Sequence, residues 1–203
     1  MIMKYKVRAR DYLSRAKKER NSNKTARLFY SALELRAGIE ARLHEYRDAI
    51  RNKRRDNTWQ VRTLKREIEK IVEKRELPVT INIHHSKTGK HYLLRYVPVS
   101  DELKSIAERL GDYLHCIPSL KVEHVGFEAE LQALVDKGIA LLSETVSGEL
   151  LAPLMFKKNS LTGILIFDEG KAPQSFKDGD TISFDAKFVV VSKSDEGITL
   201  KIA

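Results

Sequence analysis

The chain has 203 residues, a net charge of +9, 42% hydrophobic residues and one cysteine, Cys116. No apolar run reaches the roughly 18 residues of a membrane helix, and the start, MIMKYKVRAR, lacks the apolar segment of a signal peptide. A single cysteine excludes an internal disulfide and zinc sites built on two or four thiolates. A cytoplasmic protein with no membrane contact is therefore expected, long enough for one core or for one core and a small second module.

The positive charge is concentrated in the first part of the sequence. Residues 1–75 hold 23 Lys or Arg against 10 Asp or Glu, a surplus of 13 positive charges. Residues 76–203 have a surplus of 4 negative charges. A basic segment of this kind is the candidate for contact with a polyanion. The structural alternative is that these side chains only solvate exposed helix faces.

The best-specified element is a helix over residues 25–50. Its apolar residues recur every three or four positions: Leu28, Ala32, Leu35, Ile39, Leu43, Tyr46 and Ile50. A second seam through Phe29, Leu33 and Ala37 widens this stripe beyond what a surface helix needs. The pattern therefore predicts the central helix of a bundle. Arg36 and Glu40, one turn apart at its edge, are expected to form a structural ion pair.

The other elements are predicted from the same periodicities. Helices are expected over residues 4–20, 58–76, 101–117 and 127–146, with Thr58, Ser100 and Asp101 as caps. Residues 79–85 and 91–99 are rich in β-branched and aromatic residues around a loop containing Gly89, which predicts a hairpin. Four further strands are expected at 151–156, 161–167, 181–191 and 197–202.

These elements predict an α+β fold. Residues 1–146 are expected to form an antiparallel helical bundle with an inserted β-hairpin at 79–99, and residues 147–203 a small antiparallel β-sheet module. Whether the module folds without the helices stays open.

The segment Ala32–Glu40, ALELRAGIE, resembles helices of the HEPN superfamily, the helical bundles of prokaryotic toxin and phage-defence systems. The resemblance implies a helical bundle over roughly residues 1–146. It also implies, for catalytic members, a metal-independent ribonuclease with an Arg and a His separated by four to six residues, doubled across a dimer. Arg109 and His115, with five residues between them, match that spacing.

In such a ribonuclease, His would draw the proton from the 2′-hydroxyl and Arg would stabilise the phosphorane charge. In a helix, however, Arg109 and His115 point about 120° apart. A surface Arg and a half-buried His are the structural alternative.

The sequence predicts a non-catalytic component of a defence or toxin-like system that binds nucleic acid or a protein partner. Sequence-independent phosphate contacts are expected from eight basic residues: Arg8, Arg15, Lys18, Arg51, Lys53, Arg54, Arg55 and Arg62. Two alternatives stay open, namely the ribonuclease and a protein scaffold with a basic docking face. RNA, DNA, a protein partner and a homodimer are all compatible with the sequence.

No cofactor or metal is expected. His84 and His85 are adjacent in a strand and must point to opposite faces, while His91, across the hairpin, can approach one of them. No further carboxylate or thiol lies at ligand spacing.

Overall fold

The computed structural model describes residues 7–22, 24–51, 60–71, 78–85, 88–115, 126–153, 155–156, 162–175, 181–184, 187–194 and 197–202. Within these residues the helices are α1 (Ala9–Arg20), α2 (Thr25–Arg51), α3 (Val61–Ile71), α4 (Asp101–His115) and α6 (Phe127–Ser147). The strands are β1 (Val79–His85), β2 (Lys90–Tyr96), β3 (Met155–Phe156), β4 (Thr162–Leu165), β5 (Thr181–Phe184), β6 (Lys187–Ser194) and β7 (Gly197–Ile202). The predicted α+β class is confirmed.

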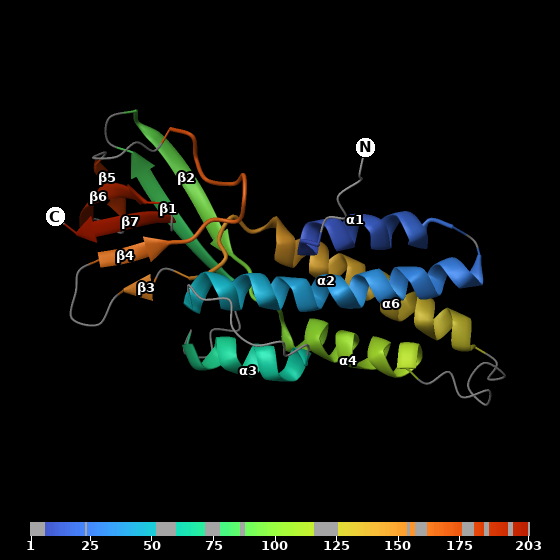
Figure 1. Cartoon of the computed structure of the whole chain (residues 1–203). Coiled ribbons are helices and arrows are strands. Elements are labelled where there is room, and N and C mark those ends of the chain that lie inside the picture. The colour runs from blue at the N-terminus through green and yellow to red at the C-terminus, as the bar shows by residue number, and fades with distance from the viewer. Residues whose placement is uncertain are drawn as a thin grey trace, which may run out of the picture.

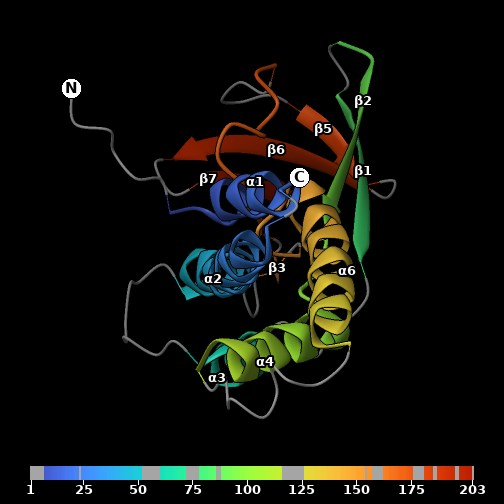
Figure 2. The same cartoon turned by 90° about the vertical axis from the view of Figure 1, so that its right-hand side faces the viewer.

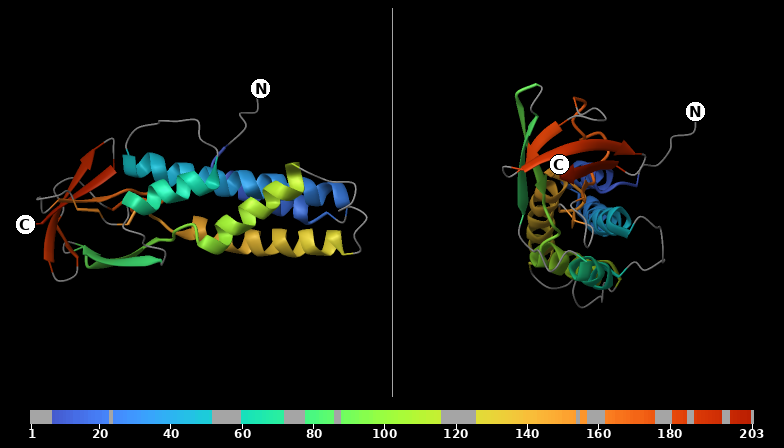
Figure 3. Two further views of the ribbon diagram at one scale, coloured as in Figure 1. Left: turned by 90° about the horizontal axis from the view of Figure 1, so that it is seen from below. Right: turned by 90° about the vertical axis from the view of Figure 1, so that its left-hand side faces the viewer.

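The molecule is elongated, with the helices side by side and the sheet at one end (Figure 1). Figure 3 shows the same division from two other sides. Seen along the bundle, α1 lies above α2, α4 lies below it, and α6 lies to its right (Figure 2). The helix α2 is therefore the centre of the bundle, as its sequence predicts.

The apolar stripe of α2 is the core. Leu35, Ile39, Leu43 and Tyr46 are at most 1% exposed. The second predicted seam is only partly buried. The ring of Phe29 packs against that of Phe127, with the ring centroids 6.1 Å apart, but Leu33 is exposed. The expectation that this seam is buried is wrong at Leu33, because no described element covers that side of α2.

The ends of two helices follow from local hydrogen bonds. The helix α1 begins at Ala9, later than predicted, because the extended Arg8 donates its N–H to the Asp11 carboxylate at 3.3 Å. The predicted cap Ser100 is confirmed, since its Oγ accepts the Leu103 N–H at 3.1 Å.

The strands form one antiparallel sheet in the order β2-β1-β5-β6-β7-β4-β3. The predicted hairpin is present as β1 and β2, with Ile83 opposite Tyr92, but β2 ends at Tyr96 and not at Val99. The predicted single strand 181–191 is wrong, because this range contains two strands. They are β5 and most of β6, which pair antiparallel with each other.

The hairpin pairs with the C-terminal strands through β1 and β5, in the register His84 to Ser183. The sheet therefore draws strands from both sides of the predicted module boundary near residue 147. The division into modules 1–146 and 147–203 stays a prediction.

Gly138 on α6 is placed where α6 meets α2 and α4. A Cβ there would lie 2.7 Å from Cδ2 of the buried Leu35 and 3.0 Å from Cγ2 of Ile106. We expect Gly138→Ala to lower the free energy of unfolding by about 1–2 kcal/mol, since overpacking outweighs the gain in helix propensity. Urea unfolding measures it, and Gln132→Ala on the exposed side of α6 is the control. An unchanged or higher urea midpoint for Gly138→Ala would contradict the close packing.

Among the helices that the structure describes, none has a stretch long and apolar enough to cross a membrane.

Candidate nucleic-acid interface and buried ion cluster

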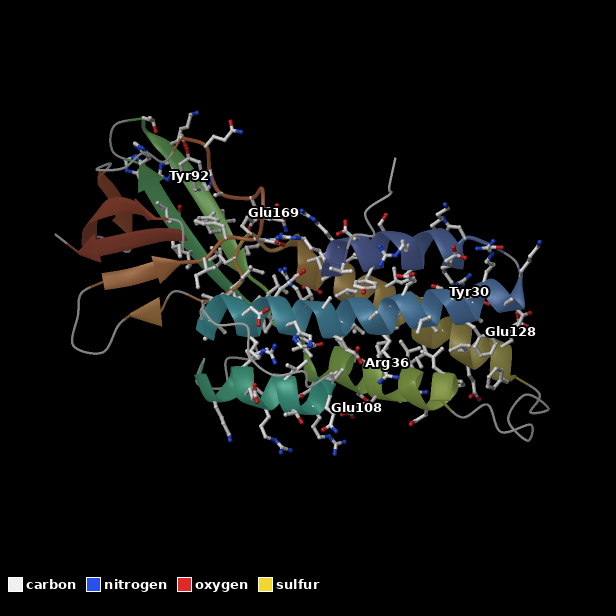
Figure 4. All side chains as sticks on the ribbon, viewed as in Figure 1. Tyr30, Arg36, Tyr92, Glu108, Glu128 and Glu169 are labelled. Atoms are coloured by element: carbon white, nitrogen blue, oxygen red, sulfur yellow. The ribbon has the colours of Figure 1, made fainter. Side chains whose placement is uncertain are left out.

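Three of the predicted phosphate contacts bind acidic side chains of the protein itself. Arg8 lies 2.7 Å from Glu169, and Arg15 lies 2.7 Å from Glu34. Arg62 lies 3.2 Å from Glu108, which Figure 4 labels where α4 meets α3. These arginines are thus partly neutralised before any ligand arrives.

The other predicted contacts fall into two groups. Lys18 is exposed on α1 and has no acidic partner within the described part of the chain. Arg51 is the last residue of α2, and Lys53, Arg54 and Arg55 lie outside the described residues. Of the predicted contacts whose side chains the structure describes, Arg8, Arg15 and Lys18 belong to α1 and its N-cap, whereas Arg62 belongs to α3.

Ion pairs inside the folded protein cancel part of the charge imbalance between the two halves of the sequence. Basic residues of the first half face acidic residues of the second half, as in Arg20 with Asp136 at 2.6 Å and Arg8 with Glu169. Lys65 likewise binds Asp101. The surplus of the first 75 residues is therefore a poor measure of what remains for a polyanion.

A group of cations remains on α3 and the start of α4, which we call the α3 basic surface: Arg62, Lys65, Arg66, Lys70 and Lys104. Arg62, Arg66 and Lys70 are exposed and lie four residues apart, which is about 6 Å along the helix. Across the described ranges, Arg66 and Lys70 form no ion pair, whereas Lys104 is close enough to Asp101 for its charge to help lower the pKa of that carboxyl. The predicted phosphate contacts do not include Arg66, Lys70 or Lys104, although the four-residue spacing of Arg62, Arg66 and Lys70 on α3 is visible in the sequence.

A cavity of about 270 Å³ lies within this surface. It is lined by four cations and two carboxylates, namely Arg62, Lys65, Arg66, Lys104, Glu69 and Asp101. Lys65 is buried and lies 3.3 Å from Glu69. Its hydrogen bond to Asp101 lowers the pKa of that carboxyl below its ordinary value. The lining carries a net charge of +2, which suits an anion.

A second cluster of charges is centred on two buried side chains, Arg42 and Asp168. The Arg42 side chain is 1% exposed and donates to Asp168 at 3.0 Å, to Glu45 at 3.0 Å and to the Thr145 carbonyl at 3.2 Å. Burial disfavours the charged guanidinium, but Tyr46, Glu45 and Asp168 outweigh it and raise the Arg42 pKa.

The surroundings of this cluster tie α2 and α6 to the segment before the C-terminal strands. Lys171 donates to the carbonyls of Val146 and Gly148 at the end of α6, and burial lowers its pKa. The Tyr46 hydroxyl donates to the Val97 carbonyl. The cluster has the geometry of a structural junction. Sequence reasoning missed it, although Arg42, seven residues after Leu35, stands on the apolar stripe.

A cleft of about 600 Å³ lies along the C-terminal half of α2. Its walls include Val7, Tyr12, Ala41 and His44. Arg47, which is always protonated, lies 2.9 Å from Nδ1 of His44, so this nitrogen accepts and Nε2 carries the hydrogen. Burial, followed by the charge of Arg47, lowers the His44 pKa. His44 is therefore neutral at pH 7.

The candidate catalytic pair is on one helix. Arg109 is exposed in the middle of α4, and His115 is the last residue of that helix. Six residues of α-helix turn by about 600°, so the two positions differ by about 120° around the axis. The two residues therefore stand on different sides of α4. Their catalytic role stays a prediction.

The remaining predicted contacts concern Arg36 and the histidines. The ion pair of Arg36 with Glu40 is confirmed at 3.2 Å. His91 faces His84 across the hairpin, with ring centroids 4.6 Å apart. Within the described residues, no group of three or more His, Cys, Asp or Glu could hold a metal ion.

No protein-family model, no curated protein and no solved structure matches this chain.

Proposed function

We propose that the protein binds the phosphate backbone of nucleic acid through the α3 basic surface. The observation that supports this proposal is that Arg66 and Lys70 form no ion pair within the part of the chain that the structure describes, and that Arg66 lines a cavity with net charge +2. Side chains of this kind bind phosphates without reading sequence. Arg51, Lys53, Arg54 and Arg55 immediately precede α3 in sequence and extend the same charge.

The resemblance of residues 32–40 to HEPN helices supports a role for this binding in a cytoplasmic prokaryotic defence or toxin-like system. The proposal is a non-catalytic binding component, because phosphate contacts of this kind need only exposed cations. Binding would be sequence-independent and would weaken steeply with salt.

A titration of labelled single-stranded RNA, duplex RNA and duplex DNA, followed by fluorescence anisotropy at several salt concentrations, tests the proposal. We expect Arg66→Glu/Lys70→Glu to weaken binding and to reduce the slope of log affinity against log salt by about 1.5, since each lost phosphate contact contributes roughly 0.7 to 0.9. Neither residue has an ion-pair partner among the described residues, and both are exposed, so the fold should be unaffected.

The matched control is Lys17→Glu/Lys24→Glu, which makes the same change of charge at two exposed lysines away from α3, neither of them a predicted phosphate contact. Equal losses for both variants would mean that only the total charge matters, and would remove the α3 basic surface as the site. Absence of binding at low salt would refute the phosphate proposal. Arg54→Glu/Arg55→Glu tests the adjoining predicted residues in the same assay.

The ribonuclease alternative is tested with the same samples on a gel. If RNA is cut, His115→Ala should abolish cleavage, because the base would be missing. Cleavage that persists in this variant would end the assignment to Arg109 and His115. The scaffold alternative predicts a stable complex with an acidic protein and no affinity for any nucleic acid.

A further inference from the structure

The cavity within the α3 basic surface is small, and its size limits what it can hold. It lies between α3 and the first turn of α4, which are neighbours on the lower side of the bundle in Figure 1. Its volume of about 270 Å³ is at the lower end of the range of ligand pockets, roughly 300 to 1,000 Å³. The cavity therefore has room for one small group but not for a stretch of strand. The buried Lys65 belongs to its lining, so it extends below the exposed cations of α3.

Both carboxylates of the lining are engaged by one cation. Lys65 lies 3.3 Å from Glu69 and also binds Asp101. The hydrogen bond from Lys65 lowers the pKa of the Asp101 carboxyl, so Asp101 stays ionised at neutral pH and holds the lysine in place. An anion that enters the cavity therefore meets carboxylates whose charge is already opposed by Lys65.

The other three residues of the lining are cations: Arg62, Arg66 and Lys104. Arg66 forms no ion pair within the described part of the chain, whereas Arg62 shares its charge with Glu108 at 3.2 Å. Lys104 stands in the first turn of α4, where the helix dipole adds positive potential. Two guanidinium groups and an ammonium group supply several hydrogen-bond donors for one anionic group.

A phosphate at the end of a strand fits this cavity better than a phosphate within the strand. A phosphate within a strand has one negative charge and a sugar on either side, so a protein contacts it from outside. A phosphate monoester carries about −1.5 to −2 charges at pH 7, has three acceptor oxygens and is attached on one side only. Its charge matches the +2 of the lining, and its single attachment allows it to enter a small cavity.

We propose that this cavity binds the terminal phosphate monoester of a nucleic-acid strand, and that the strand leads away from it along α3. Lys70 is exposed and lies one turn, about 6 Å, beyond Arg66, where it can meet the next phosphate. This assignment rests on the phosphate binding proposed above. The exposed cations of α3 give affinity for any strand, and the cavity adds a preference for a phosphorylated end.

Fluorescence anisotropy with one short, internally labelled single-stranded RNA tests the proposal. The RNA carries a 5′-phosphate, a 3′-phosphate or hydroxyl groups at both ends. We expect one phosphorylated form to bind about tenfold or more tightly than the hydroxyl form, since one additional charged hydrogen bond is worth about that factor.

The same titrations separate this proposal from backbone binding. Equal affinities of all three forms would overturn the terminal-phosphate site and leave backbone binding intact. Affinity for a phosphorylated form alone would support the cavity and refute backbone binding along α3. Absence of binding by every form at low salt would overturn both.

Two single substitutions within the α3 basic surface assign the preference to the cavity. We expect Lys104→Gln, in the lining, to lower the ratio of the affinities for phosphorylated and hydroxyl-ended RNA by about fivefold, since it removes one charged contact to the terminal group. Lys70→Gln is the matched control, because it removes the same charge outside the lining and should weaken both forms equally. A ratio that Lys104→Gln leaves unchanged, or that both variants lower equally, would overturn the assignment.

Displacement by adenosine monophosphate distinguishes a strand end from a free nucleotide, which carries the same group. We expect the mononucleotide to displace phosphorylated RNA only at a much higher concentration than unlabelled phosphorylated RNA does, because it has no second phosphate for Lys70. Displacement at the same concentration would assign the cavity to free nucleotides and overturn the proposal.

Discussion

Replacing Asp168 with alanine is expected to lower the free energy of unfolding by about 3 to 5 kcal/mol. Asp168 is 5% exposed and is 3.0 Å from the guanidinium of Arg42, which is itself 1% exposed. Without this carboxylate, Arg42 keeps the partly buried Glu45 and the Thr145 carbonyl, but it loses its more deeply buried counter-charge. A buried charge that loses a partner cannot be hydrated in compensation.

Urea unfolding at neutral pH measures this effect, and two further variants are compared with Asp168→Ala. Asp136→Ala removes the half-exposed partner of Arg20 and should cost at most about 1 kcal/mol. Asp168→Asn keeps the shape and one acceptor, and should fall between the two. Equal effects of Asp168→Ala and Asp136→Ala would mean that water reaches Arg42 in the folded protein.

Raising the pH from 10 to 12 is expected to remove about 2 kcal/mol of stability through Tyr46 alone, which is most of the loss over the complete titration. Burial raises the pKa of Tyr46 from 10.0 to about 12, against the opposing effect of Arg42. Between these values the unfolded chain loses the phenolic proton while the folded protein retains it, so the stabilisation is complete below pH 10 and is lost as pH approaches 12. Two pKa units correspond to about 2.7 kcal/mol.

The measurement is the urea midpoint as a function of pH, compared with that of Tyr46→Phe. The variant loses the hydrogen bond to Val97 at all pH values, but it should show a shallower fall between pH 10 and 12. Burial also raises the pKa of Tyr96, so a residual slope is expected in the variant. Parallel curves would contradict the burial of the Tyr46 hydroxyl.

The helices were predictable because their signal is local. The spacing of Leu35, Ile39 and Leu43 fixes one buried side of α2 whatever it packs against. The fate of Leu33 was not predictable in this way. Its burial depends on whether another element lies over the adjacent side, and no pattern within α2 contains that information.

The sheet and the ion pairs were harder to predict from the sequence, because they join elements that are distant in the chain. The hairpin follows from its alternating strands and the loop at Gly89, but the pairing of β1 with β5 joins segments about a hundred residues apart. The basic residues of α1 could be counted, but the acids that neutralise Arg8 and Arg20 lie on other elements. Counting charges therefore predicted a surface for a polyanion, but it did not show which basic residues stay exposed and unpaired with acidic ones.

The bond between Arg42 and Asp168 also sets an order of events during synthesis. The two residues are 126 positions apart. At roughly 5 to 20 residues per second, a ribosome needs about 6 to 25 seconds to make the second after the first. During that interval α2 exists with a charged guanidinium on its apolar stripe and without its carboxylate from the later segment. The early helices must keep that position hydrated until Asp168 emerges, so the bundle acquires its final packing only when the last quarter of the chain arrives.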